Sequence, residues 1–148
     1  MAATPPIFTR PAYLLYKAGI YAQKAFDDAF GAVGLSAREF LVLGFATTEP
    51  LSQQDIARRL GIDPTVLVGV VDELERRRLV ERRRDPDDRR RYLLAVTETG
   101  AELLAKAEQA ATEATNTYLD PLDRTQRRQL GELLITLMTP KMPWLEDR

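Results

Sequence analysis

Hydrophobic residues recur at helical spacing over the first part of the chain. Over residues 13–30 the apolar positions follow a period near 3.6 on more than one side, which predicts a helix with packing partners on two faces. Ser36 precedes Glu39 by three residues, and Ser52 precedes Asp55 by the same spacing. Both pairs are typical of helix N-termini, because the hydroxyl and the acid satisfy backbone N–H groups there.

Two of the predicted helices form a helix-turn-helix. The helix over residues 52–60 is ended by Gly61. Asp63 and Pro64 then start a second helix, with the aspartate as N-cap and the proline at the first helical position, and this helix extends to about Arg77. Four positions of the second helix have the spacing of a buried face: Leu67, Val70, Val71 and Leu74.

The hydrophobic period changes after this second helix. The pattern predicts two short strands, 79–84 and 91–96, joined by the polar turn Asp-Pro-Asp-Asp at residues 85–88. A hairpin directly after a helix-turn-helix is the arrangement of a winged helix. In that arrangement the second helix enters the DNA major groove, and the hairpin reaches the phosphates and the adjacent minor groove.

Helical spacing returns after the hairpin. Thr97 and Thr99 lead a helix that runs to about Tyr118, and Asp123 leads a last helix that Pro140 ends. The predicted order is therefore four helices, two strands and two helices. The fold class is mainly α with a small β-hairpin (α+β).

Arginine is concentrated in one segment. Residues 76–91 hold nine arginines and four acidic residues, a net charge of +5, whereas the remaining 132 residues carry −6 and the whole chain −1. A basic hairpin fits binding to phosphates, which releases counterions and makes affinity depend on salt. Two pairs at i,i+4 spacing, Asp72–Arg76 and Glu73–Arg77, indicate that part of this charge is structural.

The chain lacks cysteine and histidine. Their absence excludes Ser–His–Asp and Cys–His catalysis, and it argues against thiol redox sensing and zinc sensing. We therefore expect no enzyme, no catalytic residues, no metal and no cofactor. The N-terminal sequence lacks a secretory signal pattern, and no apolar run reaches the length of a membrane span, so we expect a cytoplasmic protein without membrane contact.

Several motifs lie at fixed spacing within residues 50–100: the helix-turn-helix, LVER entering the hairpin, DPDDRR at its tip and a Thr-x-x-Gly exit. On these motifs the chain resembles the MarR (multiple antibiotic resistance regulator) family of bacterial transcription factors. The resemblance implies a homodimer, with residues 1–35 and 98–148 as a helical dimerisation region and 36–97 as a winged helix-turn-helix DNA-binding domain. It also implies a repressor that binds a pseudo-palindromic operator, often with a small-molecule site between the two parts.

The resemblance and the charge pattern select candidate contacts to double-stranded DNA. Within the hairpin, a pair between Asp88 and Arg90 would fix the direction of the arginine, which we expect to enter the minor groove. The DNA-binding candidates are Gln53, Gln54, Thr65, Val66, Val68, Gly69, Arg76, Arg82, Arg84, Asp88, Arg89, Arg90 and Arg91.

Two departures from the family's common pattern affect this prediction. Val68 and Gly69 stand where members commonly carry Thr-Arg, so the arginine that reads a base is missing. Val68 offers contact with a thymine methyl and Gly69 a close backbone approach, while base selection rests more on the polar candidates and on DNA shape. Arg78 stands where a helix-ending glycine is common, so it adopts either a left-handed conformation or a different helix exit.

The aromatic residues outside the helix-turn-helix admit two interpretations. They form the core of a dimer, or they line a pocket for a small aromatic or phenolic effector with an arginine as its anion partner. The candidates for this ligand site are Tyr13, Tyr16, Arg38 and Phe40.

A second class of function also fits the sequence. The winged helix would then be a protein-interaction or assembly module, and the arginine-rich hairpin would meet an acidic protein partner. Competition between specific and unrelated DNA separates this alternative from a regulator that reads DNA sequence.

Overall fold

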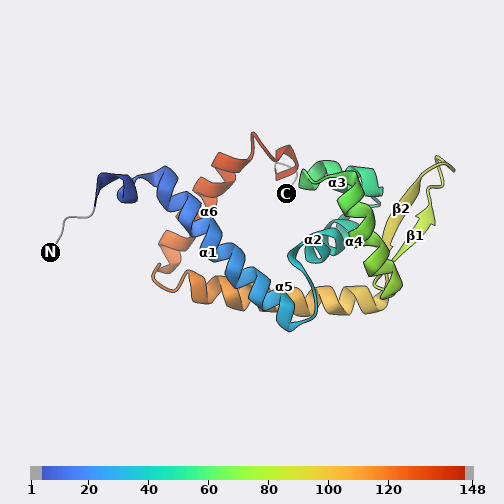
Figure 1. Ribbon diagram of the computed structural model, residues 1–148, viewed down its shortest axis with the longest axis horizontal. Helices are drawn as coiled ribbons and strands as arrows, with labels where there is room; N and C mark the ends of the chain where they lie inside the picture. The colour runs from blue at the N-terminus through green and yellow to red at the C-terminus, as the bar shows by residue number, and fades with distance from the viewer. Residues whose placement is uncertain (1–4, 146–148) are drawn as a thin grey trace.

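The predicted order of elements is confirmed by the computed structural model, which describes residues 5–145 (Figure 1). The ends of the predicted dimerisation region, residues 1–4 and 146–148, lie outside the described part of the chain. Two 3₁₀ turns that the pattern did not predict, η1 and η2, flank the helices. The elements are η1 (Pro6–Thr9), α1 (Pro11–Ala32), α2 (Ala37–Thr48), α3 (Gln53–Leu60), α4 (Pro64–Arg76), β1 (Val80–Arg84), β2 (Tyr92–Val96), α5 (Glu98–Tyr118), α6 (Arg124–Met138) and η2 (Pro143–Leu145).

Side-chain caps explain why the helices begin where the sequence predicts. The Ser36 hydroxyl accepts a hydrogen bond from the Glu39 N–H (3.2 Å), and the Glu39 carboxylate accepts one from the Ser36 N–H (2.7 Å), which forms the capping box of α2. A cap of this kind stabilises a helix by about 1 kcal/mol. Thr97, and not Thr99, is the N-cap of α5, because its hydroxyl accepts from the Gly100 N–H (3.0 Å).

Helix α4 ends in a left-handed residue, one of the two exits that the sequence left open. Arg78 has a φ of 58°, and the N–H of Leu79 donates to the Leu74 carbonyl at 2.9 Å. A left-handed backbone costs a residue other than glycine about 1–2 kcal/mol. The Arg78 carbonyl accepts from the Thr97 hydroxyl at 2.7 Å, and this bond holds the exit in place.

One cluster of buried residues joins α2, α3, α4, the hairpin and α5. Leu43 of α2, Ile56 of α3 and Leu74 of α4 are fully buried. Three of the four predicted core positions of α4 are buried, while Val70 lies half-buried at the edge of the cluster. The packing fixes the position of α4 relative to its neighbours, which is what a recognition element requires.

The hairpin projects from one end of the molecule. Its strands pair antiparallel, from Val80 opposite Val96 at the base to Arg84 opposite Tyr92 towards the tip. Helix α5 runs along one edge of the molecule, from the hairpin base to the region of α1 and α6 (Figure 1). The hairpin and α6 therefore lie at opposite ends of α5.

One arginine joins the end of α4 to the corner between α1 and α2. Arg77 donates to the Glu39 carboxylate at 3.1 Å and to the Gly34 carbonyl at 2.8 Å. The predicted Glu73–Arg77 pair is therefore wrong, since the arginine bonds to groups far away in the sequence. Glu39 is buried and also caps α2, so its carboxylate serves two elements.

Helix α6 and the first half of α1 expose large apolar side chains. No residue of α6 is buried, and Leu133 and Leu137 are 68% and 48% exposed. On α1, Leu14, Leu15 and Tyr21 are also exposed. Apolar surface of this extent on helices is typical of a contact surface with another protein chain.

Residues 5–145 contain no single helix that is both long and apolar enough to cross a membrane. Helices α1 and α2 reach the required length and composition only as a pair, and this pair is bent by 78° at its junction. Within the same residues, no group of three acidic side chains is arranged to hold a metal ion.

Candidate nucleic-acid interface

Helices α3 and α4 form the predicted helix-turn-helix. The Ser52 hydroxyl accepts from the Asp55 N–H at 3.3 Å and donates to the Asp55 carboxylate at 2.6 Å, which fixes the start of α3. Asp63 accepts from the Thr65 N–H at 2.7 Å and fixes the start of α4. That backbone hydrogen bond also holds the pKa of Asp63 below its ordinary value. Side chains within three residues thus set both helix starts.

The outer face of α4 is uncharged over its first two turns. Val66 and Val68 are 43% and 42% exposed, and Thr65 and Gly69 beside them are exposed as well. A Cβ added at Gly69 would meet no atom within 4 Å, so the space in front of this position is open. Helical geometry places Thr65 and Gly69 at the centre of this exposed surface and the two valines on its opposite flanks. A winged helix presents such a surface to the major groove.

The first arginine of the hairpin is held against α4. Arg82 donates to the Asp72 carboxylate at 2.6 Å and to the Gln53 side-chain oxygen at 3.2 Å, and it forms a further ion pair with Glu75. Burial opposes the charge of this half-buried arginine, but the bond to Asp72 and the charges of Glu75 and Asp72 outweigh it and raise the pKa of Arg82. Arg82 therefore positions the hairpin on α4, with most of its donors already used.

A second arginine joins the hairpin to α3. Arg91 donates to the Asp55 carboxylate at 2.6 Å. The pKa of Asp55 lies below its ordinary value, chiefly because the Ser52 hydroxyl donates to it, with Arg91 and Arg58 adding to the effect against the cost of burial. The carboxylate that caps α3 thus also holds the far strand of the hairpin in place.

The tip of the hairpin is organised by aspartates that bind backbone groups. Asp88 accepts from the backbone N–H of Arg90 at 2.9 Å, and Asp85 accepts from the N–H of Asp87 at 2.9 Å. The predicted pair between the side chains of Asp88 and Arg90 is therefore wrong. In a tight turn the short aspartate reaches the nearby N–H groups, and the arginine side chain is left in solvent.

Arg76 also has a partner other than the predicted one. Its guanidinium binds Glu73 through two parallel bonds of 2.9 and 2.6 Å, and these raise the pKa of Arg76. The predicted Asp72–Arg76 pair is wrong, because Asp72 binds Arg82. All three acids of α4, Asp72, Glu73 and Glu75, are thus paired with arginines.

Among the nine arginines of residues 76–91, four have no ion pair with a carboxylate in the described part of the chain. Arg78 ends α4, and the Arg84 guanidinium lies 5.7 Å from the centre of the Tyr92 ring. Arg89 and Arg90 lie exposed at the hairpin tip. The free positive charge is therefore concentrated on the outer half of the hairpin.

Several of the predicted DNA contacts share one groove of about 260 Å³. The groove lies between the start of α3 and the hairpin. The exposed face of α4, the second helix of the helix-turn-helix, is not part of its lining. Asp88, Arg84 and Arg89 lie on the hairpin outside this groove, and Arg76 lies at the far end of α4. The groove is lined by Ser52, Gln53, Gln54, Arg82, Arg90, Arg91 and Tyr92.

The four predicted ligand residues do not come together within one protomer. Tyr13 and Tyr16 lie in the first two turns of α1. The ring of Tyr13 packs on that of Phe8, with 5.2 Å between the ring centres. Phe40 lies on α2 and stacks on Phe30 at the other end of α1. Seventeen residues of helix separate Tyr13 from Phe30, a rise of about 25 Å.

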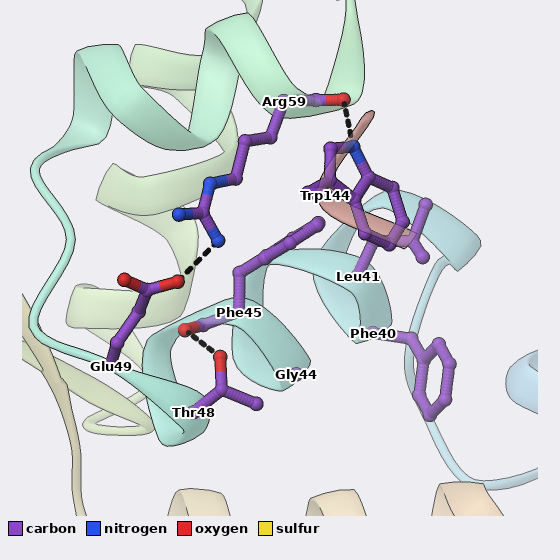
Figure 2. A pocket seen from close by; sticks show the side chains of 8 residues that line it. All are labelled: Phe40, Leu41, Gly44, Phe45, Thr48, Glu49, Arg59 and Trp144. Atoms are coloured by element: carbon purple, nitrogen blue, oxygen red, sulfur yellow. Dashed lines mark hydrogen bonds and ion pairs between the residues drawn. The ribbon is translucent and has the colours of Figure 1, made fainter. Parts of the chain in front are cut away.

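A different cavity, of about 340 Å³, lies between α2, the end of α3 and η2, and Phe40 is the one ligand candidate that lines it (Figure 2). The Trp144 indole N–H donates to the Arg59 carbonyl at 3.3 Å. The Trp144 and Phe45 rings pack edge to face, with 5.1 Å between the ring centres. The Arg59 guanidinium lies 5.7 Å from the Phe45 ring centre and pairs with Glu49. The sequence carried no signal for this cavity, because Trp144 and Arg59 are 85 positions apart.

A model of the MarR family matches residues 33–91, which run from the end of α1 to the end of the hairpin turn. A putative transcriptional regulatory protein for the hcr operon of Thauera aromatica is 36% identical over 89 residues. That match covers 60% of this chain and 54% of the relative, so the chain spans about half the length of this protein.

Solved structures extend the similarity to nearly the whole chain. A MarR-family transcriptional regulator from Rhodococcus sp. RHA1 is 32% identical and has a TM-score of 0.81, over 95% of this chain and 98% of that one. CouR from Rhodococcus jostii RHA1, solved with p-coumaroyl-CoA, is 33% identical with a TM-score of 0.80, over 95% and 97% of the two chains. The repressor CouR on a 23-mer DNA duplex is 30% identical with a TM-score of 0.82, over 93% and 98%.

Proposed function

The chain belongs to the MarR family of transcriptional regulators, and on this premise we propose that it acts as a homodimeric repressor. Each protomer places α4 in the major groove and its hairpin on the phosphates and in the adjacent minor groove. Residues 36–97 form the DNA-binding domain, and residues 1–35 and 98–148 form the dimerisation region. The operator is a pseudo-palindrome whose half-sites lie about one helical turn apart.

One observation carries this proposal: an exposed, uncharged helix face lies beside a hairpin with unpaired arginines. Arg89 and Arg90 extend from the hairpin tip, while Arg82 and Arg91 bind acids on α4 and α3 and fix the hairpin's position. The helix supplies contacts to base edges, and the free arginines supply contacts to phosphates. The exposed leucines of α6 support the dimer.

Selection from a library of random DNA duplexes tests the function. We expect the full chain to enrich a pseudo-palindromic sequence and to stay bound to it in a gel shift with excess unrelated duplex. If no sequence is enriched and every duplex competes equally, the protein is not a sequence-specific regulator. The alternative, an interaction module whose hairpin meets an acidic protein, then becomes the better explanation.

Arg90→Ala tests the placement of the hairpin. We expect about a tenfold loss of affinity for the selected duplex at moderate salt, and a salt slope smaller by about one, because one contact to DNA is lost. Lys106→Ala is the matched control, since it removes one exposed charge from α5. Equal affinity of Arg90→Ala and the wild type, with equal salt slopes, would show that this arginine does not touch DNA.

We further propose that a small aromatic acid controls DNA binding from the cavity beside Trp144. Phe40, Phe45 and Trp144 supply aromatic walls, and Arg59 supplies a cation. An acid that binds the Arg59 guanidinium competes with Glu49. It lies next to the indole that is bonded to the last turn of α3, so the ligand contacts reach the helix-turn-helix. The CouR structure with p-coumaroyl-CoA supports an aromatic ligand class.

Trp144 is the chain's single tryptophan, so its fluorescence reports on the cavity directly. We expect p-coumarate to change the emission of Trp144 and to release the selected duplex in a gel shift. Glu49→Gln removes the competing carboxylate and is expected to bind p-coumarate several-fold more tightly. If emission stays constant in millimolar p-coumarate and related phenolic acids, these compounds do not bind there.

A further inference from the structure

The recognition surface of α4 has an unusual chemistry for a DNA-binding helix. Its exposed residues from Thr65 to Gly69 include two valines and no charged side chain. Val66 and Val68 each leave more than two fifths of their surface in solvent. Leu67, between them in sequence, is fully buried, so the valines are not part of the core. Their apolar surface is available to a ligand.

The charged residues that follow on α4 are paired before DNA binds. Asp72 binds Arg82, and Glu73 binds Arg76 through two bonds. No arginine therefore extends freely from α4 over residues 64–76. A two-bond contact from an arginine to guanine, the commonest specific contact in the major groove, is not available from this helix without breaking one of these pairs.

Gln53 at the start of α3 is restricted in the same way. Its side-chain oxygen accepts from Arg82, which has only donors, so the amide orientation is fixed by chemistry. The remaining amide NH₂ is a donor. Reading adenine with two bonds requires both the oxygen and the NH₂ of a glutamine. The Gln53 oxygen already accepts one bond from Arg82 and keeps one lone pair, so Gln53 can present both groups to an adenine only in the orientation that Arg82 fixes.

We infer that α4 recognises thymine through its 5-methyl group, with Val66 and Val68 as the specificity-determining residues. This inference rests on the proposed function and adds the base chemistry to it. Thymine is the one base that presents an apolar group in the major groove. The free arginines of the neighbouring hairpin supply the charge that brings a duplex to this face. At Gly69 a Cβ would meet no side chain beyond its immediate chain neighbours within 4 Å, so the helix surface between the two valines is open.

Substitution of deoxyuridine for thymidine tests the inference, because it removes only the 5-methyl group. The probe is the duplex enriched by the full chain, with each half-site thymine replaced in turn. We expect about fourfold weaker binding for each contacted thymine, the effect of losing one buried methyl group of about 0.8 kcal/mol. Replacement of a contacted T·A pair by 5-methylcytosine·G, which keeps the methyl, is expected to bind more tightly than replacement by C·G.

Val68→Ala identifies the residue that contacts the methyl. Because Val68 is exposed, we expect this variant to keep the wild-type melting temperature. It should bind the thymine duplex several-fold more weakly and should lose its sensitivity to deoxyuridine at one position of each half-site. The control variant Lys106→Ala is expected to respond to every deoxyuridine replacement in the duplex as the wild type does.

The outcomes separate the two proposals. If the enriched duplex binds equally well with deoxyuridine at every half-site position, the methyl inference is overturned while the regulator stands. If Val68→Ala loses the same affinity relative to the wild type on the thymine duplex as on every deoxyuridine duplex, Val68 does not contact a thymine methyl. If no duplex is enriched, the proposed function fails and the inference with it.

Discussion

Replacement of both Leu133 and Leu137 by aspartate is expected to convert the protein to a monomer and to weaken operator binding at least about 100-fold. Both leucines lie largely exposed on α6, a helix without a buried residue. Burying one leucine side chain stabilises an interface by about 1.5–3 kcal/mol, and a two-fold dimer contains each position twice. Aspartates there remove this gain and place charges in an apolar contact.

The effect on DNA follows from the geometry of two linked half-sites. Once one protomer is bound, its partner is held near the second half-site at a high effective concentration, which typically raises affinity by about 10²–10⁴. A monomer retains only contacts to one half-site. Analytical ultracentrifugation measures the conversion to a monomer, and a gel shift on the selected duplex measures the loss of DNA affinity.

Arg128→Asp is the matched control for this experiment. It also introduces an acid on α6, but at a position that helical geometry puts on the opposite face from Leu133 and Leu137. We expect this variant to remain a dimer. Should the double leucine variant sediment with the wild-type mass, the exposed face of α6 is not the dimer contact.

Gly100→Ala is expected to lower the free energy of unfolding by about 3 kcal/mol or more. A Cβ at this position would lie 2.0 Å from the Leu79 carbonyl oxygen and 2.9 Å from a methyl of Val96. The Leu79 oxygen is held by the Thr97 N–H at 3.1 Å. Because the obstacle is backbone at the base of the hairpin, the hairpin has to shift as a unit.

Gly131→Ala makes the same chemical change at an open site on α6. A Cβ there meets no atom within 4 Å, and alanine favours a helix over glycine by up to about 1 kcal/mol. We therefore expect Gly131→Ala to be neutral or stabilising. Urea unfolding at one protomer concentration compares the two variants. Equal midpoints for Gly100→Ala and the wild type would mean that the backbone at Leu79 yields at little cost.

The helix-turn-helix and the hairpin were predictable from the sequence because their signals are local. Ser36, Ser52 and Asp63 lie within three residues of the N–H groups that they cap. Gly61 ends α3 in a left-handed conformation that glycine adopts at low cost. Such features depend on neighbouring residues and need no knowledge of the remaining chain.

The partners of the arginines were not predictable in this way. Helical spacing favours pairs four residues apart, yet Arg77 bonds to Glu39 and Arg82 to Asp72 and Glu75. An arginine has a long side chain with five donors, so acids that the fold brings close compete with those on its own helix. The cavity beside Trp144 was missed for the same reason, because its walls come from distant segments without a shared period.

The contact of Arg77 with Gly34 and Glu39 has a mechanical consequence. Hydrogen bonds of 2.8 and 3.1 Å weaken once donor and acceptor move apart by about half an ångström. The end of α4 and the corner between α1 and α2 therefore keep a nearly constant separation while both bonds hold. A rotation of the end of α1 is therefore transmitted to α4, so Arg77 couples the α1–α2 corner mechanically to the helix that faces DNA.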